Sequence, residues 1–243
     1  MPRRNPVGVL GSDLPAEDGR ALRVRNPEGL FLLLGLWWGL LWRPLWRLFS
    51  GLGAKALKIE FRAEVEGEMS DLRYPIGKFT TEGVALATER AHFIAQIERT
   101  PAELRAAVEG LSAEQLDTPY RPEGWTVRQV VHHVPDSHMN SFIRCKLALT
   151  EEEPTIKPYD EDSWARLGDV RNTPVEVSLD LLESLHQRWV VLLRSLRDEE
   201  WSRTFRHPEL GLMSLEKNLA LYAWHGRHHV AHITSLRERR GWN

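Results

Sequence analysis

The sequence predicts an all-α protein built as a bundle of four main helices with one long crossover connection. Three observations support this fold class. Helix-start signals recur from residue 80 onward, apolar residues between them follow helical spacing, and the alternating pattern of strands is scarce. With 243 residues, of which 42% are hydrophobic and 27% charged, the chain is long enough to bury a core.

The first two helices are predicted from capping boxes. Thr100 is followed by Pro101 and, three residues after the threonine, by a glutamate, so we expect a helix to start, or to be interrupted, at Pro101. The second helix is expected to begin at Thr126, with Gln129 completing the box. Its apolar stripe follows at helical spacing: Val127, Val130, Val131 and Val134.

The last two helices follow a long link. Thr173 and the proline after it repeat the start signal of the first helix, and Ser214 can cap a fourth helix that Gly241 ends. Their apolar stripes are Leu181, Leu182, Leu185, Trp189 and Leu192, and then Leu215, Leu219, Tyr222, Val230 and Ile233. The link from Thr150 to Asn172 is the predicted crossover.

Composition divides the chain into an N-terminal extension, residues 1–68, and a globular domain, residues 69–243. The extension contains an uncharged run from Gly29 to Trp42, which is shorter than the about 20 residues that a bilayer crossing needs. Three interpretations stay open: an interfacial or membrane anchor, a signal peptide, and an artefact of start-site choice, because ordinary composition begins at Met69. Membrane contact is expected only if residues 29–47 belong to the protein.

Charge and cysteine usage exclude several function classes. A formal net charge of −2 without a long basic run argues against a nucleic-acid-binding protein. Cys145 is the single cysteine, which excludes an internal disulfide and a cysteine-rich zinc site and favours a reducing, cytoplasmic location. Cys145 is not expected to be a nucleophile, because small buried cysteines are usually inert.

The stretch WHGRHHVAH, residues 224–232, contains four histidines. On a helical wheel His225 and His229 flank the apolar stripe, His232 lies slightly further out, and His228 points most nearly away. Histidines four residues apart share one face and can bind one ion, as in the HExxH motif. No glutamate follows His225 here, so the mechanism of HExxH proteases is not supported.

Two imidazoles make an incomplete site, since a catalytic zinc commonly has three protein ligands and one open position. His132 or His133 is the expected source of the third ligand. The two lie at about equal and opposite angles from the valine stripe, so spacing leaves the choice open. His138 lies nearly in line with that stripe and is expected to be a core histidine or one that supports a ligand. Buried, hydrogen-bonded imidazoles without a metal are the alternative for the whole cluster.

Six motifs in order carry a family resemblance: YPIGKF (74–79), LDTPYRPEGWTVRQVVHHVPDSHMNSFIRCKLALTEE (116–152), PYDE (158–161), LH-x-RWV (185–190), HPE (207–209) and LYAWHGRHHVAHI (221–233). They are similar to the YfiT branch of the DinB-like, bacillithiol-transferase-like family of metal-dependent four-helix bundles. The resemblance covers about residues 72–242 and implies a DinB-like four-helix bundle. Nothing in it covers residues 1–68.

The resemblance also implies the site. By its motifs His133, His225 and His229 are the metal ligands, holding one Zn²⁺, or Ni²⁺, per chain. The implied function is a metal-dependent hydrolase acting on a small-molecule substrate, and the implied assembly is a homodimer. Two alternatives stay open: a bacillithiol-type thiol S-transferase that uses a low-molecular-weight thiol, and a non-catalytic metal-binding stress protein.

One residue departs from the family pattern. Pro135 stands two residues after His133, where it removes a backbone donor, so we expect a kink that could shift the metal geometry. Asp136, Asn140 and Arg144 share the predicted helix of His133 and are candidates for supporting its position. The sequence identifies no general base.

Overall fold

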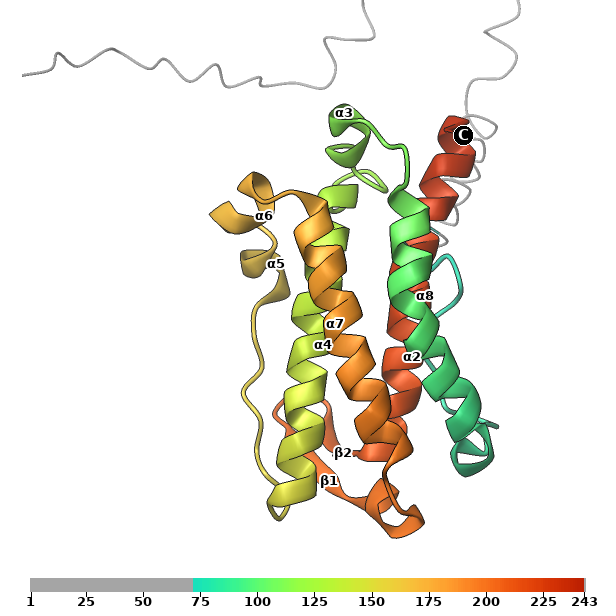
Figure 1. Cartoon of the computed structure of the whole chain (residues 1–243), viewed down its shortest axis with the longest axis vertical. Coiled ribbons are helices and arrows are strands. Elements are labelled where there is room, and N and C mark those ends of the chain that lie inside the picture. The colour runs from blue at the N-terminus through green and yellow to red at the C-terminus, as the bar shows by residue number, and fades with distance from the viewer. Residues whose placement is uncertain (1–71, 243) are drawn as a thin grey trace, which may run out of the picture. The chain divides into compact units, whose positions relative to one another are not determined.

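The computed structural model describes residues 72–242, and its main feature is a bundle of four long helices (Figure 1). They are α2 (Leu86–Val108), α4 (Val127–Thr150), α7 (Val175–Arg194) and α8 (Leu215–Arg240). The predicted all-α class and four-helix bundle are therefore confirmed. The expectations for residues 1–68, including the apolar run, lie outside the described residues. Within the described residues, no helix has the length and hydropathy that crossing a membrane would need.

The order of the helices around the bundle differs from their order in the chain. Helix α2 packs against α7 and α8, and α4 packs against the same two helices. Figure 1 shows α4 and α7 running in one direction while α2 and α8 run in the other. Because α4 and α7 are consecutive and parallel, the chain must return along the length of the bundle between them. This return is the predicted crossover, and it carries two short helices, α5 (Glu161–Trp164) and α6 (Gly168–Asn172).

The connection from α7 to α8 contains a hairpin that the sequence did not predict. After the 3₁₀ helix η3 (Asp198–Ser202), strands β1 (Thr204–His207) and β2 (Gly211–Ser214) pair antiparallel. Phe205 and Met213 face each other across the hairpin and are both buried in the core. Strands of four residues are too short to give a recognisable alternating pattern.

Three of the predicted helix boundaries are confirmed. At the start of α4, the Thr126 side chain accepts a hydrogen bond from the Gln129 backbone, and the Gln129 side chain accepts one from the Thr126 backbone. At the start of α8, the Ser214 hydroxyl accepts a hydrogen bond from the backbone N–H of Lys217. Gly241 ends α8 with φ of 64°, a left-handed conformation that suits glycine.

Two of the predicted caps are wrong. Helix α2 runs unbroken through Pro101, and Thr100 is fully buried with its hydroxyl donating to the Gln96 carbonyl. Likewise, α7 begins one residue later than the threonine signal implied, and its N-cap is Pro174, without a side-chain cap. Helix α4 also continues through Pro135 without a break, so the proline beside His133 does not end the helix.

The core consists of two apolar clusters at different levels of the bundle. One contains residues such as Ile97, Trp189, Phe205 and Leu219, and the other contains Leu104, Val130, Leu182 and Ile233. On each of the four long helices, one stretch belongs to the first cluster and another to the second. Most of the buried polar residues, histidines above all, fall between the two stretches. The bundle therefore contains a polar layer, and the candidate site lies in it.

Candidate metal centre

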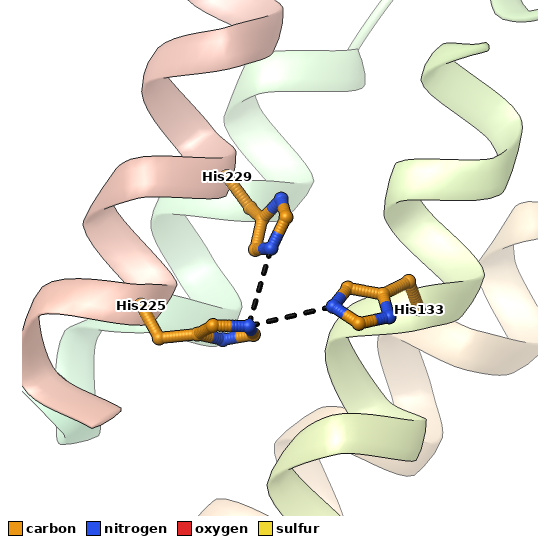
Figure 2. Close-up of side chains that lie close together, drawn as sticks. All are labelled: His133, His225 and His229. Atoms are coloured by element: carbon orange, nitrogen blue, oxygen red, sulfur yellow. Dashed lines mark hydrogen bonds between the residues drawn. The ribbon is translucent and has the colours of Figure 1, made fainter. Parts of the chain in front are cut away.

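Three histidine side chains converge between α4 and α8 (Figure 2). His225 and His229 come from successive turns of α8, and His133 comes from the facing helix α4. The Nε2 atom of His225 lies 3.4 Å from Nε2 of His133 and 3.2 Å from Nε2 of His229. One ligand atom from each residue lies within 4.8 Å of the other two.

These separations suit a single divalent ion. Two imidazole nitrogens that bind one zinc tetrahedrally at about 2.0 Å lie about 3.3 Å from each other. Both Nε2 separations of His225 are close to that value. The donor set is all nitrogen, which zinc and nickel both accept. The residues present therefore fit the metal that the sequence led us to expect.

The three imidazoles are neutral near pH 7, which is the form that binds metals. Burial, followed by the nearby charge of His232, lowers the pKa of His133 to about 3. Burial and then the charge of His133 hold the pKa of His225 well below its ordinary value, and burial and then the charge of His225 do the same for His229.

The structure separates the two neighbouring histidines that helical spacing could not. The Nδ1 atom of His132 lies 2.7 Å from the Ser178 hydroxyl on α7, so this imidazole faces the neighbouring helix. His133 instead faces α8, where it approaches His225 and His229. His133 is thus the member of the pair that the fold brings to the cluster.

Two other histidines on α8 are buried by residues outside the bundle. His228 and His232 are both buried, although the helical wheel placed them outside the apolar stripe. Residues from outside the four helices cover this face. The ring of Tyr120 stacks on His232 at 4.0 Å, and Tyr74 stacks on His228 at 5.9 Å. His232 also donates from Nε2 to the carbonyl of Arg73.

The residue that supports a candidate ligand is His138, as its position in the stripe suggested. His138 is fully buried, and its Nε2 lies 3.1 Å from Nδ1 of His225. The candidates Asp136, Asn140 and Arg144 do not take this role. None of them makes a hydrogen bond to the three histidines in the part of the chain that the structure describes, and Asn140 donates to a carbonyl of its own helix.

The sequence and the fold match a known group of proteins. The sequence model of the DinB superfamily matches residues 96–233. The chain belongs to the DinB superfamily. Relatives from Bacillus mycoides and Bacillus cereus strain 03BB102 are 59% and 60% identical over 174 residues, which is 72% of this chain and 100% of each relative. Both are provisionally named metal-dependent hydrolases.

A solved structure is similar as well. YfiT from Bacillus subtilis is 50% identical in sequence, and the match has a TM-score of 0.69 over 71% of this chain and 99% of YfiT. YfiT is described as a probable metal-dependent hydrolase with an unusual four-helix bundle topology. The parallel pairing of α4 with α7 and the long crossover agree with such a topology.

A cleft of about 600 Å³ is lined by the three histidines. Trp125 forms one wall: its ring centroid is 4.6 Å from that of His133, and it stacks on His229 at 6.4 Å. The Trp125 indole N–H donates to Asp162 at 2.8 Å, which fixes the ring. Sequence reasoning missed this wall because Trp125 precedes α4 and Asp162 lies far along the chain in the crossover.

The cleft also contains a carboxyl group that sequence reasoning did not single out. Glu161, the first residue of α5, lines the cleft together with the three histidines. Glu161 is an exposed residue, yet desolvation of its carboxyl and then the nearby charge of Asp162 raise its pKa. A titratable group with a perturbed pKa in a cleft is a candidate for proton transfer. In the sequence, the position of Glu161 at the end of the PYDE motif could have indicated this residue.

Proposed function

We propose that the protein is a metal-dependent hydrolase that holds one Zn²⁺, or Ni²⁺, per chain with His133, His225 and His229. The observation that carries the proposal is the convergence of three neutral imidazoles, two of them buried and His225 half-buried, in a cleft large enough for a small-molecule substrate. The provisional names of the relatives and the description of YfiT support the same reaction class.

The chemistry divides between the ion and the protein. A divalent ion on three neutral imidazoles keeps its positive charge, lowers the pKa of a bound water and polarises a carbonyl group. His133, His225 and His229 would hold the ion beside the cleft that they line. Trp125 excludes water from one side of the site. Glu161 accepts the proton of the attacking water, because its raised pKa brings it closer to the working pH.

The first prediction concerns metal content. Purified protein should contain about one divalent ion per chain, and the variant with alanine at positions 133, 225 and 229 should contain none, because all three ligand atoms are removed. Elemental analysis measures this. The matched control is His132→Ala, which removes a buried neighbouring histidine that faces Ser178 and should keep its metal. Unchanged metal content in the triple variant would contradict the site.

The second prediction concerns the reaction. The metal-loaded protein should cleave members of an ester and amide panel without any thiol, and Glu161→Gln should lower kcat by about 10²-fold while metal content is unchanged. Glu152→Gln is the control, because it makes the same replacement at an exposed glutamate outside the cleft and should leave kcat unchanged.

The same assay separates hydrolysis from thiol transfer. A thiol S-transferase would instead conjugate monochlorobimane to bacillithiol and would be insensitive to Glu161→Gln, because its nucleophile is a thiolate rather than water. Equal activity with and without metal would refute both kinds of enzyme.

A further inference from the structure

Behind the candidate metal centre, a chain of hydrogen bonds crosses the whole bundle. Nδ1 of His225 lies 3.1 Å from Nε2 of His138, and Nδ1 of His138 lies 2.8 Å from Nε2 of His186. Nδ1 of His186 then donates to the carbonyl oxygen of Ile97 at 2.6 Å. The four residues come from α8, α4, α7 and α2, so each long helix supplies one member, in the order in which the helices surround the bundle.

The carbonyl at the end determines the direction of every bond in this chain. A carbonyl oxygen can only accept, so His186 carries its proton on Nδ1 and its Nε2 is an acceptor. Neutral His138 must therefore donate from Nδ1, which leaves its Nε2 as an acceptor as well. His225 in turn donates from Nδ1, and the lone pair of its Nε2 is free on the side of the ring that faces His133 and His229.

The carbonyl acceptor at the end of this series of hydrogen bonds depends on Pro101. In a regular helix the N–H of residue 101 would donate to the carbonyl of residue 97, but proline has no N–H. The proline inside α2 thus leaves the Ile97 carbonyl without its usual helical partner, and His186 donates to it instead. Pro101, which the sequence suggested as a helix start, thus frees the Ile97 carbonyl to accept the last of these hydrogen bonds.

The surroundings keep the two intermediate histidines neutral and fixed. His138 and His186 are 0% and 2% exposed, and Trp189 packs edge-on against both rings. Burial lowers the pKa of His186 to about 4, and burial and then the nearby His186 hold the pKa of His138 well below its ordinary value. Near pH 7 neither ring carries a second proton, which would make both of its nitrogens donors and change the direction of the hydrogen bonds.

We propose that His138 and His186 are positioning residues, through which the Ile97 carbonyl sets the tautomer and orientation of His225 for metal binding. The inference rests on the proposed metal role of His225. His225 is the histidine whose Nε2 approaches both other candidate ligands. By contrast, Nδ1 of His229 is buried with no hydrogen-bond partner among the described residues. Partners behind a ligating imidazole typically change metal affinity by about 10- to 100-fold when they are removed.

The direct test is the tautomer of each histidine in the full-length, metal-free protein, assigned by ¹⁵N NMR of the ring nitrogens. We expect the proton on Nδ1 of His225, His138 and His186. A proton on Nε2 of any of the three would overturn the inference. This measurement needs no substitution, and its outcome does not depend on whether the protein binds a metal.

The second test measures zinc affinity by competition with a chromogenic chelator. His186→Phe removes the acceptor for His138 and should weaken zinc binding by about 10-fold or more. His186→Gln keeps an amide that can both donate and accept, and should restore most of the affinity. His132→Phe is the matched control, because it makes the same replacement at a buried histidine outside the chain and should leave affinity unchanged.

The outcomes separate the two proposals. Equal affinity in wild type and His186→Phe, or an equal loss in His132→Phe, would overturn the positioning role. If wild-type protein binds no zinc, the metal site itself is refuted, and the tautomers of the metal-free protein still decide whether the chain has the inferred direction. If His186→Phe does not fold, as judged by circular dichroism, the same tautomer assignment in wild type decides the inference.

Discussion

At the scale of single residues, Cys145 limits what thiol chemistry the protein can perform by itself. Its side chain is 3% exposed, and burial raises the pKa of the thiol to about 12. The thiolate is the reactive form, so Cys145 should be inert at pH 8. We expect no iodoacetamide labelling of native protein and complete labelling in urea, measured by mass spectrometry. Rapid labelling of the folded protein would contradict this prediction. If Cys145 is inert, a thiol-transfer reaction would have to use a thiol from outside the protein.

The candidate ligands show which site residues a sequence can reveal. His225 and His229 are predictable because helical spacing alone puts them on one face. Helical spacing cannot choose between His132 and His133, because the two lie symmetrically about the valine stripe. The residue that distinguishes them, Ser178, is on another helix. The family resemblance favoured His133, whose side chain the structure places beside the other two. The role inferred for His186 depends on a carbonyl on a third helix, which no local pattern indicates.

At the scale of elements, the contact between α2 and α8 depends on Gly226. A Cβ atom at Gly226 would lie 2.6 Å from Oγ1 and 2.7 Å from Cγ2 of Thr100. Alanine normally stabilises a helix interior relative to glycine by about 1 kcal/mol. Here the clash should outweigh that gain, so Gly226→Ala should lower the free energy of unfolding in urea by about 1–3 kcal/mol.

A double variant tests the cause of that loss. Thr100→Ala removes Oγ1 and Cγ2, the two atoms in closest contact, and leaves the Cβ atom at 3.2 Å. The cost of Gly226→Ala should therefore be smaller in the Thr100→Ala background than in wild type. Equal costs in the two backgrounds would show that Thr100 is not what the new methyl group meets.

The same contact explains why one capping prediction failed while another held. Both Thr100 and Thr126 open a capping-box pattern, and spacing cannot tell them apart. Thr126 precedes its helix, so its side chain is free to bond the backbone. Thr100 is instead packed against Gly226, and continuing α2 buries Ile97 and Leu104 on either side of it. Tertiary packing overrode the local signal.

At the scale of the whole molecule, a protein that starts at Met69 should fold and bind metal without residues 1–68. Residues 72–242 supply two apolar clusters and the three candidate ligands. Relatives of this chain match over 174 residues, which is their full length. Circular dichroism and elemental analysis, with the full chain as the reference, measure the result. An insoluble or metal-free product would show that the extension completes the domain.

Burial of many neutral histidines should make the metal-free protein sensitive to acid. Burial is the first cause of a lowered pKa at nine positions: His132, His133, His138, His186, His207, His225, His228, His229 and His232. Below the ordinary pKa of 6.5, the unfolded chain therefore binds more protons than the folded one. The free energy of unfolding must then fall as pH falls, until the folded histidines titrate as well.

Two carboxyl groups oppose this trend. Burial raises the pKa of Asp136 to about 6 and also raises that of Glu161, so the folded state holds protons that the unfolded state releases, and these groups stabilise the fold as pH falls. Nine histidines outnumber two carboxyls, so the net effect is destabilisation between pH 6.5 and about 4, the pKa of His186. Each histidine whose effect is not offset by a carboxyl lowers the free energy of unfolding by at most about 1.4 kcal/mol per pH unit.

Urea unfolding of chelator-treated protein at pH 7.5, 6.5 and 5.5 measures this dependence. The free energy of unfolding should already fall between pH 7.5 and 6.5, where the unfolded histidines begin to bind protons, and should fall more steeply between pH 6.5 and 5.5. His132→Asn keeps a donor and an acceptor near Ser178 but removes one titrating ring, so its pH slope should be shallower by up to one proton. A profile that is flat or rises below pH 6.5 would show that the buried histidines are already protonated in the folded protein, and the neutral ligands that the metal site requires would then be absent.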